Sequence, residues 1–266
     1  MLRRTSRFLT RPEFWRNPVG SVSRRIVWRT HWKLRQEKPF IVDYVGGLRL
    51  KLAPSTASSG IYLNQGFSDS TNARLFLDFL GPGMVAFDVG AHIGEYTVLF
   101  GSAVGSGGCV HAFEPDLKVL PFLHDNVEIN HLTNVTVNGV AMADTKGSES
   151  FTPQTDATAS SLTRFAKLEQ GRAVEVPTTT IDAYVEEARI EMLHALKIDV
   201  EGAEVAVLQG GSRTLQTLRP GLLLVECHSA GISRSAESML RELDYVVEVD
   251  SSHAYPHLRA RPANPR

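Results

Sequence analysis

The chain has 266 residues, of which 42 % are hydrophobic and 21 % are charged. This composition indicates an ordinary soluble globular protein with one sizeable core, and the length leaves room for one domain of the usual α/β size plus extensions. The net charge of −1 is unevenly distributed: residues 1–35 hold ten basic residues and one acid, a net charge of +9, and the rest holds 18 basic and 28 acidic residues, a net charge of −10. This asymmetry indicates an anionic partner for the N-terminal arm, such as lipid headgroups, nucleic acid or another protein.

The two cysteines, Cys109 and Cys227, lie in apolar strand-like runs, where buried free thiols are expected. The N-terminal arginines lack the apolar core of a signal peptide, and no stretch is long and apolar enough to span a bilayer. The sequence therefore predicts a cytoplasmic protein. Peripheral attachment to the inner face of the membrane, through residues 1–35, is an open alternative.

Residues 1–35 are predicted to form a basic arm whose helix starts at Asn17-Pro18. Trp28 and Trp32 fall on its basic side. Its aliphatic residues share one face, which consists of Val19, Val22, Ile26, Val27 and Leu34. Two interpretations stay open: either this face packs on the domain and the basic face is solvated, or the helix lies in an anionic lipid surface.

Residues 36–83 are predicted to form an accessory hairpin and helix. Two strand-like runs, 40–45 and 48–52, flank Gly46-Gly47, which suits a two-residue turn because glycine tolerates positive φ. A loop of small residues is expected over 55–60. Asp69 or Ser70 is expected to cap a helix that runs to Leu80.

From Met84 onward, apolar strand-like runs alternate with helical segments, which predicts a parallel sheet with right-handed crossovers. Residues 139–176 are less regular, with a hairpin expected at Gly147 and a loop over 152–161. The strands are expected over Val85–Asp88, Val110–Phe113, Val135–Val137, Leu196–Val200 and Leu222–Val225. The helices are expected from Gly94, over Leu117–Ile129, over Ile181–Glu187 and after Gly202 up to Leu208.

The turn after the first of these strands reads Asp-x-Gly-x-x-x-Gly, from Asp88 through Gly90 and His92 to Gly94. It differs from the Gly-x-Gly-x-x-Gly turn of dinucleotide-binding proteins, which disfavours a hydride-transfer dehydrogenase. The acidic residue suits a ligand with positive charge, and the helix N-terminus offers N–H groups to a carboxylate. S-adenosylmethionine (AdoMet), which carries an ammonium, a sulfonium and a carboxylate, meets these conditions.

Ligands of such sheets bind beyond the carboxyl ends of the strands. Glu114 ends the second strand of this domain, where an acid can accept hydrogen bonds from both hydroxyls of a ribose. Asp88 has a second possible role, which is to cap its own turn. The residues predicted to bind the cofactor are Asp88, Gly90, His92, Gly94, Glu114, Ala141 and Asp199.

Four segments resemble, in the same order, the motifs of FkbM-type AdoMet-dependent methyltransferases. They are Asp88–Gly94, Ala112–Pro115, Lys197–Glu204 and Arg219-Pro220 with Glu226. The resemblance implies an α/β class I methyltransferase fold, Rossmann-like, with a mostly parallel doubly wound sheet over residues 84–266. It also implies AdoMet as cofactor and O-methylation of a free hydroxyl on a glycan, glycolipid or natural product. His92 stands where the family commonly has asparagine.

Methyl transfer to a hydroxyl needs alignment of the acceptor and removal of its proton. His228 has the pKa range of a general base, and a histidine that only hydrogen-bonds a loop is the open alternative. Asp199 is expected to orient the acceptor or bind the methionine ammonium, and Glu201 lines the same place or caps the next helix. These three residues are the catalytic candidates. Lys197 is interpreted as the partner of a nearby carboxylate.

No metal is expected, because Asp199 and Glu201 alone make a thin site for magnesium. The chain lacks an Asn-Pro-Pro-Tyr-like block, which argues against the amine of a nucleic-acid base as target. Two alternatives stay open: an RNA methyltransferase that uses the basic arm, although nucleic acid is the less favoured partner, and a catalytically inactive AdoMet-binding scaffold. The sequence does not predict the oligomeric state.

Overall fold

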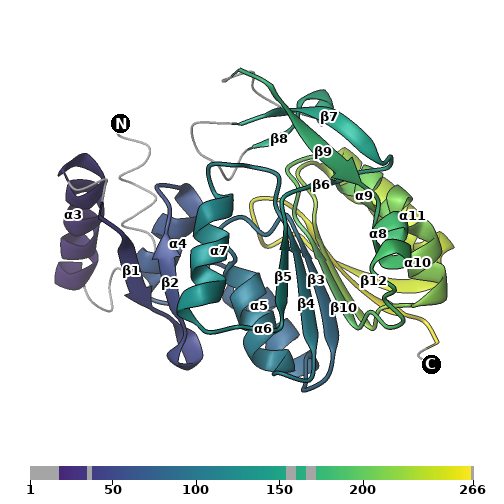
Figure 1. Cartoon of the computed structure of the whole chain (residues 1–266), viewed down its shortest axis with the longest axis horizontal. Helices are drawn as coiled ribbons and strands as arrows, with labels where there is room; N and C mark the ends of the chain where they lie inside the picture. Colours follow the sequence, from purple (N-terminus) through teal and green to yellow (C-terminus); the bar gives the residue numbers. More distant parts are fainter. Residues whose placement is uncertain (1–17, 35–37, 154–159, 166–171, 265–266) are drawn as a thin grey trace. The chain divides into compact units, whose positions relative to one another are not determined.

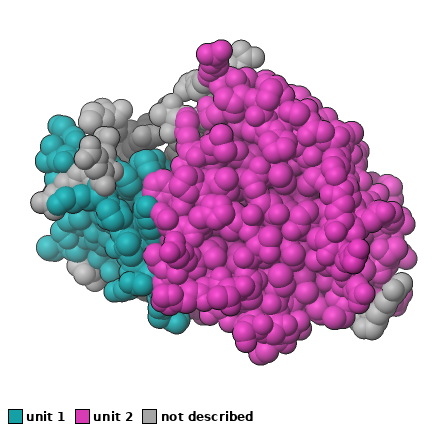
Figure 2. Space-filling model, in the orientation of Figure 1, with its two compact units in different colours: residues 1–70 teal, residues 71–266 magenta. Residues whose placement is uncertain are grey.

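The computed structural model describes residues 18–34, 38–153, 160–165 and 172–264. The chain forms two compact units, residues 1–70 and residues 71–266 (Figure 2). Helix α5 (Ser70–Phe79) begins at this boundary and ends before Gly81, as its predicted stop signal requires, and the capping role of Asp69 or Ser70 stays a prediction. The three-part division at residues 35 and 83 stays a prediction.

In the first unit, helix α3 (Pro18–Leu34) begins where the Asn17-Pro18 signal places it. Trp28, His31 and Trp32 all pack against Phe40. The aromatic side of the helix is therefore the packed one, and Val22 and Ile26 are exposed. The interpretation in which the aliphatic face is covered is wrong, because aromatic packing determines which face turns inward.

The predicted hairpin is confirmed as strands β1 (Phe40–Asp43) and β2 (Arg49–Leu52), paired antiparallel. Its turn is wider than two residues, because the last pair is Asp43 with Arg49 and a 3₁₀ turn, η1 (Val45–Gly47), lies between them. Gly46 and Gly47 do adopt positive φ, of 65° and 81°.

The small-residue segment after β2 is a helix, α4 (Thr56–Asn64), and the loop expected there is wrong. The Ser55 side chain accepts a hydrogen bond from the Ser58 N–H at 3.2 Å, which caps the first turn. This cap satisfies an otherwise unpaired N–H group and so offsets the weak helix propensity of serine and threonine.

The second unit contains a seven-stranded sheet with the order β12-β13-β11-β10-β3-β4-β5 (Figure 1). Its strands are β3 (Val85–Val89), β4 (Cys109–Phe113), β5 (Val135–Asn138), β10 (Ala195–Ile198), β11 (Leu222–Glu226), β12 (Tyr245–Asp250) and β13 (His257–Pro262). The neighbours from β11 through β5 pair in parallel, whereas β13 pairs antiparallel with both β11 and β12. The predicted mostly parallel Rossmann-like sheet is confirmed.

Helices cover both faces of this sheet, as a doubly wound fold requires (Figure 1). Helices α5, α6 (Glu95–Val104) and α7 (Leu120–Ile129) lie on one face. The other face carries α8 (Ile181–Glu187), α9 (Glu204–Gly210), α10 (Ser212–Thr217) and α11 (Ala230–Glu242). Alternate strand residues such as Phe87, Leu196 and Leu223 build the main core against this second group.

The irregular segment after β5 forms a second, small sheet with the order β6-β9-β7-β8. Its strands are β6 (Ala141–Met142), β7 (Gly147–Thr152), β8 (Ser161–Leu162) and β9 (Val174–Thr179), and the 3₁₀ turn η3 (Thr163–Phe165) follows β8. The hairpin predicted at Gly147 is wrong, because Gly147 pairs with Thr178 and β6 pairs with β9. Most of the predicted 152–161 loop lies outside the described residues.

Candidate active site

The strand order reverses between β3 and β10, so the loops that leave these two strands meet at the carboxyl edge of the sheet. Gly90 has a φ of 76°, and a Cβ atom there would lie 1.7 Å from the backbone oxygen of Asp199. Only glycine fits this contact. The loop after β4 joins the same edge, because the N–H groups of Gly90 and Ala91 both donate to the Phe113 carbonyl at 3.0 Å.

Asp88 and Lys197 form a buried ion pair at this edge. The parallel register places them side by side on β3 and β10, and Asp88 Oδ1 lies 3.3 Å from Lys197 Nζ. The other carboxylate oxygen accepts a hydrogen bond from the Thr97 hydroxyl of α6 at 2.6 Å. The interpretation of Lys197 as an ion-pair partner is confirmed. Asp88 is fully buried, and each of its carboxylate oxygens faces a partner from the protein itself.

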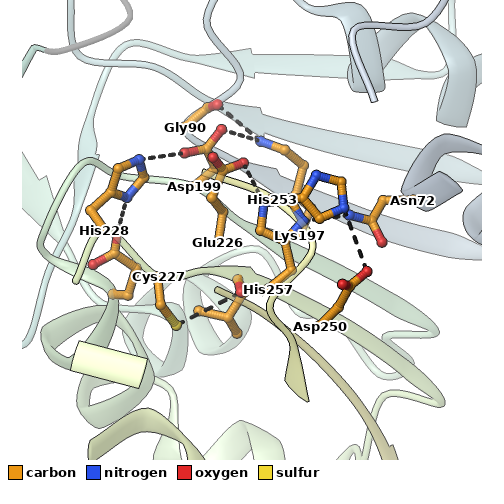
Figure 3. Close-up of polar contacts among 12 residues, drawn as sticks. Asn72, Gly90, Lys197, Asp199, Glu226, Cys227, His228, Asp250, His253 and His257 are labelled. Atoms are coloured by element: carbon orange, nitrogen blue, oxygen red, sulfur yellow. Dashed lines mark hydrogen bonds and ion pairs between the residues drawn. The ribbon is translucent and has the colours of Figure 1, made fainter. Parts of the chain in front are cut away.

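Lys197 also donates to the Gly90 carbonyl at 3.2 Å and lies 3.6 Å from Asp199 Oδ2 (Figure 3). Burial alone would lower the pKa of this amine, but the charges of Asp88, Asp199 and Glu226 raise it above its ordinary value. Lys197 is therefore a fixed cation beneath the glycine turn.

Glu114 is buried at the end of β4, and backbone groups hold both of its oxygens. Its Oε2 accepts from the His92 N–H and its Oε1 from the Asp116 N–H, each at 2.8 Å. Burial raises the pKa of Glu114 to about 7, and the two N–H groups partly offset this effect. The carboxylate is thus oriented beside the glycine turn, where the sequence predicts contact with a ribose. Gly94, with φ of 88°, caps α6, and a Cβ atom there would lie 2.5 Å from Leu123.

His228, which follows β11, is buried between carboxylates on both sides of its ring. Its Nδ1 lies 2.6 Å from Glu204 Oε1, and its Nε2 lies 3.2 Å from Glu201 Oε1 and 3.7 Å from Asp199 Oδ1. Burial lowers the pKa of the imidazole, but these acids outweigh burial and raise it to about 11. At neutral pH both ring nitrogens carry protons, which does not favour the general-base role expected from the sequence.

Glu201 and Gly202 form a tight turn after β10, with φ of 54° and 119°. Burial raises the pKa of Glu201 above its ordinary value, against the opposing effect of His228. A Cβ atom at Gly202 would lie 3.3 Å from Phe165 of η3. The small sheet therefore borders the site through η3, a contact that the sequence did not predict. Ala141 is buried in β6 of the same sheet.

The acidic cluster at this edge consists of Asp88, Asp199, Glu201, Glu204 and Glu226, with Lys197 and His228 as its cations. His257 Nε2 lies 3.5 Å from Glu226 Oε2, and even with this histidine counted as a cation, carboxylates outnumber cations here among the residues that the structure describes. Glu204 and Glu226 were quoted in the sequence motifs without a site role. The available signals were the position of Glu204 at the start of a helix and that of Glu226 at a strand end.

Asp199, Glu226 and His228 each offer one possible metal-ligand atom, and these atoms lie within 4.8 Å of one another. A divalent ion there would have to replace a proton on His228 and lie close to the Lys197 ammonium. Two cations thus already occupy the favourable positions around Asp199. The positive charges of Lys197 and His228 disfavour a metal ion at this place. That the reaction uses no metal ion stays a prediction.

Comparisons with known proteins agree with the motifs at this edge. A family model described as the methyltransferase FkbM domain matches residues 88–255. The chain is 25 % identical over 176 residues to the hexuronic acid methyltransferase AglP of Haloferax volcanii, covering 66 % of this chain and 69 % of that protein. It is 31 % identical over 204 residues to the 31-O-demethyl-FK506 methyltransferase FkbM of Streptomyces tacrolimicus, and the match covers 63 % of this chain and 76 % of that protein. A Thermotoga maritima SAM-dependent O-methyltransferase structure aligns with a TM-score of 0.47 at 14 % identity, covering 88 % of this chain and 82 % of that one.

Proposed function

The chain belongs to the FkbM methyltransferase family and is an AdoMet-dependent methyltransferase, and we propose that its acceptor is a hydroxyl group on a glycan, glycolipid or natural product. AdoMet supplies an electrophilic methyl group whose transfer leaves a neutral thioether. The steps that remain for this chain are to bind the cofactor, align the hydroxyl and accept its proton.

The donor groups at the sheet edge suit the cofactor. In this proposal Glu114 accepts hydrogen bonds from the ribose hydroxyls, because both of its oxygens are already oriented by backbone N–H groups. Asp199, whose side chain is partly exposed, binds the methionine ammonium. The turn that contains Gly90, His92 and Gly94 lets the backbone come close to the cofactor. Ala141 belongs to the proposed cofactor wall, and Asp88 acts indirectly by fixing Lys197 and Thr97.

The excess of carboxylates at this sheet edge is the observation that carries the choice of a hydroxyl. A hexuronic acid, for which the relative AglP is named, offers both hydroxyls and a carboxylate. A carboxylate acceptor would enter a site whose acids outnumber its cations, and like charges at short distance repel strongly. A neutral hydroxyl meets no such cost and finds proton acceptors there.

We assign the proton to Glu201 rather than to His228. Glu201 is partly exposed, with 25 % of its side chain accessible, and its raised pKa lies nearer to working pH than that of an ordinary carboxylate. His228 lies 3.2 Å away and holds Glu201 Oε1 in place as a cation, while Glu204 fixes the opposite side of the ring. In this arrangement Asp199 orients the acceptor as well as the cofactor.

Transfer of labelled methyl from AdoMet to matched acceptors tests the proposal. The set is a neutral methyl hexoside, the corresponding hexuronic acid, its methyl ester and bulk RNA. We expect label on the hexoside and the ester as a base-stable ether. Label only as a base-labile ester on the hexuronic acid, or only on RNA, would contradict the proposal. Absence of transfer to every acceptor in the set would favour the inactive scaffold.

A further inference from the structure

The aliphatic face of α3 is exposed although the opposite face is packed. Val19, Ile26 and Leu34 expose 81 %, 60 % and 71 % of their surface, and Val22 and Val27 expose 44 % and 48 %. An amphipathic helix of a globular protein normally turns such a face to the core. Here these five residues share one exposed side of the helix, called the aliphatic face below.

The packed side prevents α3 from rotating to bury these residues. Trp28 lies edge-on to Phe40, with ring centroids 5.4 Å apart, and is stacked on Tyr62 of α4 at 5.9 Å. Trp32 and His31 join the same aromatic group, and Ser21 on this side is buried. Residues 21, 28 and 32 lie on one side of a 3.6-residue helix and residues 19, 22 and 26 on the other. The exposure of the aliphatic face is therefore fixed by its own unit.

Positive charge borders the aliphatic face. Arg29 and Lys33 are exposed and follow Val22 and Ile26 by seven residues each, which places them on the same flank of the helix. α3 contains no acidic residue, and residues 1–35 as a whole carry ten basic residues and one acid. Apolar side chains flanked by basic ones match the headgroup and upper acyl region of an anionic bilayer.

We propose that α3 lies in the interface of an anionic lipid bilayer, with its aliphatic face inserted and Arg29 and Lys33 at the headgroups. The described part of the chain contains no helix of the length and apolarity needed to cross a membrane. The 17 residues of α3 supply about 25 Å of contact along the bilayer surface. This inference rests on the proposed function in one respect: it places the site near hydroxyl acceptors that are linked to lipid.

Charge alone would also suit RNA, but RNA binding gives no role to five exposed aliphatic side chains. Nucleic-acid contacts of a basic helix are made by arginine and lysine to phosphates and fall steeply with salt. Lipid binding needs both terms, the basic residues and the aliphatic face. The two partners therefore predict different responses to an aliphatic substitution.

The test is cosedimentation of the full chain with vesicles of phosphatidylcholine alone or mixed with phosphatidylserine. The aliphatic variant is Val19→Ser/Ile26→Ser/Leu34→Ser, and its control replaces three equally exposed apolar residues elsewhere, Leu117→Ser/Met192→Ser/Val246→Ser. The charge variant is Arg29→Glu/Lys33→Glu, with Arg172→Glu/Arg234→Glu as control. Tryptophan fluorescence, which reports on the packing of Trp28 and Trp32 in the first unit, and AdoMet affinity, which reports on the second, together verify that each variant is folded.

We expect wild type to sediment with the phosphatidylserine vesicles only, and less so in about 1 M salt, where the Debye length falls to about 3 Å. Both α3 variants should bind these vesicles about tenfold more weakly or worse. One loses the insertion of the aliphatic face and the other loses the attraction of Arg29 and Lys33 to the headgroups, whereas both controls should bind like wild type. Wild type that ignores anionic vesicles at low salt would overturn the proposal. So would an aliphatic variant that binds vesicles normally, or salt-sensitive RNA binding in the absence of vesicle binding. Methylation of soluble hexosides is measured without vesicles, so its failure is distinguishable from failure of lipid binding.

Discussion

The carboxyl edge of the large sheet and helix α3 both depend on charged residues, but they place them in opposite environments. At the sheet edge Asp88, Lys197, Glu204 and His228 are buried, and each has an oppositely charged partner within 4 Å. On α3 the flanking residues Arg29 and Lys33 are exposed. A buried charge that loses its partner is costly, whereas an exposed charge is solvated by water. Substitutions of the charged residues at the sheet edge should therefore change folding and catalysis. Substitutions of Arg29 and Lys33 on α3 should change only the binding of the protein to a membrane.

The strongest challenge to this contrast is Lys197→Met. It leaves Asp88 buried without its cation, and we expect the free energy of unfolding to fall by about 3–5 kcal/mol. Chemical denaturation measures this loss. The matched control is Lys146→Met, because Lys146 pairs with Glu187 at the surface, with 56 % of each side chain exposed. That pair should contribute about 0–1 kcal/mol. Equal losses in both variants would remove the contrast.

Glu201→Gln should lower turnover by about 100-fold, the lower range for loss of a general base. AdoMet affinity should stay the same, since the defect lies in the chemical step. Glu248→Gln, at an exposed acid on β12 with 72 % of its side chain accessible, is the control. Full turnover in Glu201→Gln together with its loss in His228→Asn would return the base role to the histidine.

The pH dependence of turnover separates the same two bases. A carboxylate base is active once it is deprotonated, so with Glu201 the rate should rise through its raised pKa and then level off. With His228 as base the rate should continue to rise toward pH about 11, where the imidazole loses its second proton. A plateau at neutral pH is the expected result, and a rate that is still rising at pH 9 would contradict it.

Glu114→Gln should weaken AdoMet binding by about 1–3 kcal/mol, because it removes a charged acceptor and places an amide donor against one of two backbone N–H groups. Wild-type affinity should fall as pH drops below about 7, since the carboxylate protonates there and loses its charge and part of its acceptor capacity. Calorimetry across pH should show this fall in wild type and in the exposed control Glu128→Gln. A flat wild-type profile would exclude Glu114 as the titrating contact.

The smallest expected effect is that of metal removal. Lys197 and His228 already neutralise part of the acidic cluster, so we expect turnover to be unchanged by EDTA. An EDTA-sensitive rate that magnesium restores would instead place a cation between Asp199, Glu226 and His228.

The sequence predicted the parallel half of the fold well, because its signals are local. The apolar runs, Gly90, Gly94 and the strand-end acids each report on their own segment, and the structure places Asp88, Glu114, Asp199, Glu201 and His228 at one sheet edge. The small sheet escaped prediction because its strands are short and rich in serine, threonine and glutamate.

The protonation of His228 and the orientation of α3 were beyond sequence reasoning for a different reason. Both depend on contacts between distant segments. Glu204 and Glu201 come from the loop and helix after β10, yet they determine the charge of a histidine that follows β11. Phe40 and Tyr62 similarly determine which face of α3 is packed. The sequence periodicity correctly grouped the aliphatic residues on one face of the helix. It gave no means of deciding whether this face or the aromatic face packs against the rest of the unit.

The most direct test of the central claim, hydroxyl methylation at the acidic edge, uses AdoMet labelled with ¹³C in its methyl group. Wild type and Glu201→Gln are incubated with a hydroxylated glycan extract, and the bond of the transferred carbon is identified by NMR. We expect a methyl ether carbon in the wild-type product and its near absence with Glu201→Gln. A labelled methyl ester, N-methyl or C-methyl product, or an ether formed equally by both proteins, would contradict it.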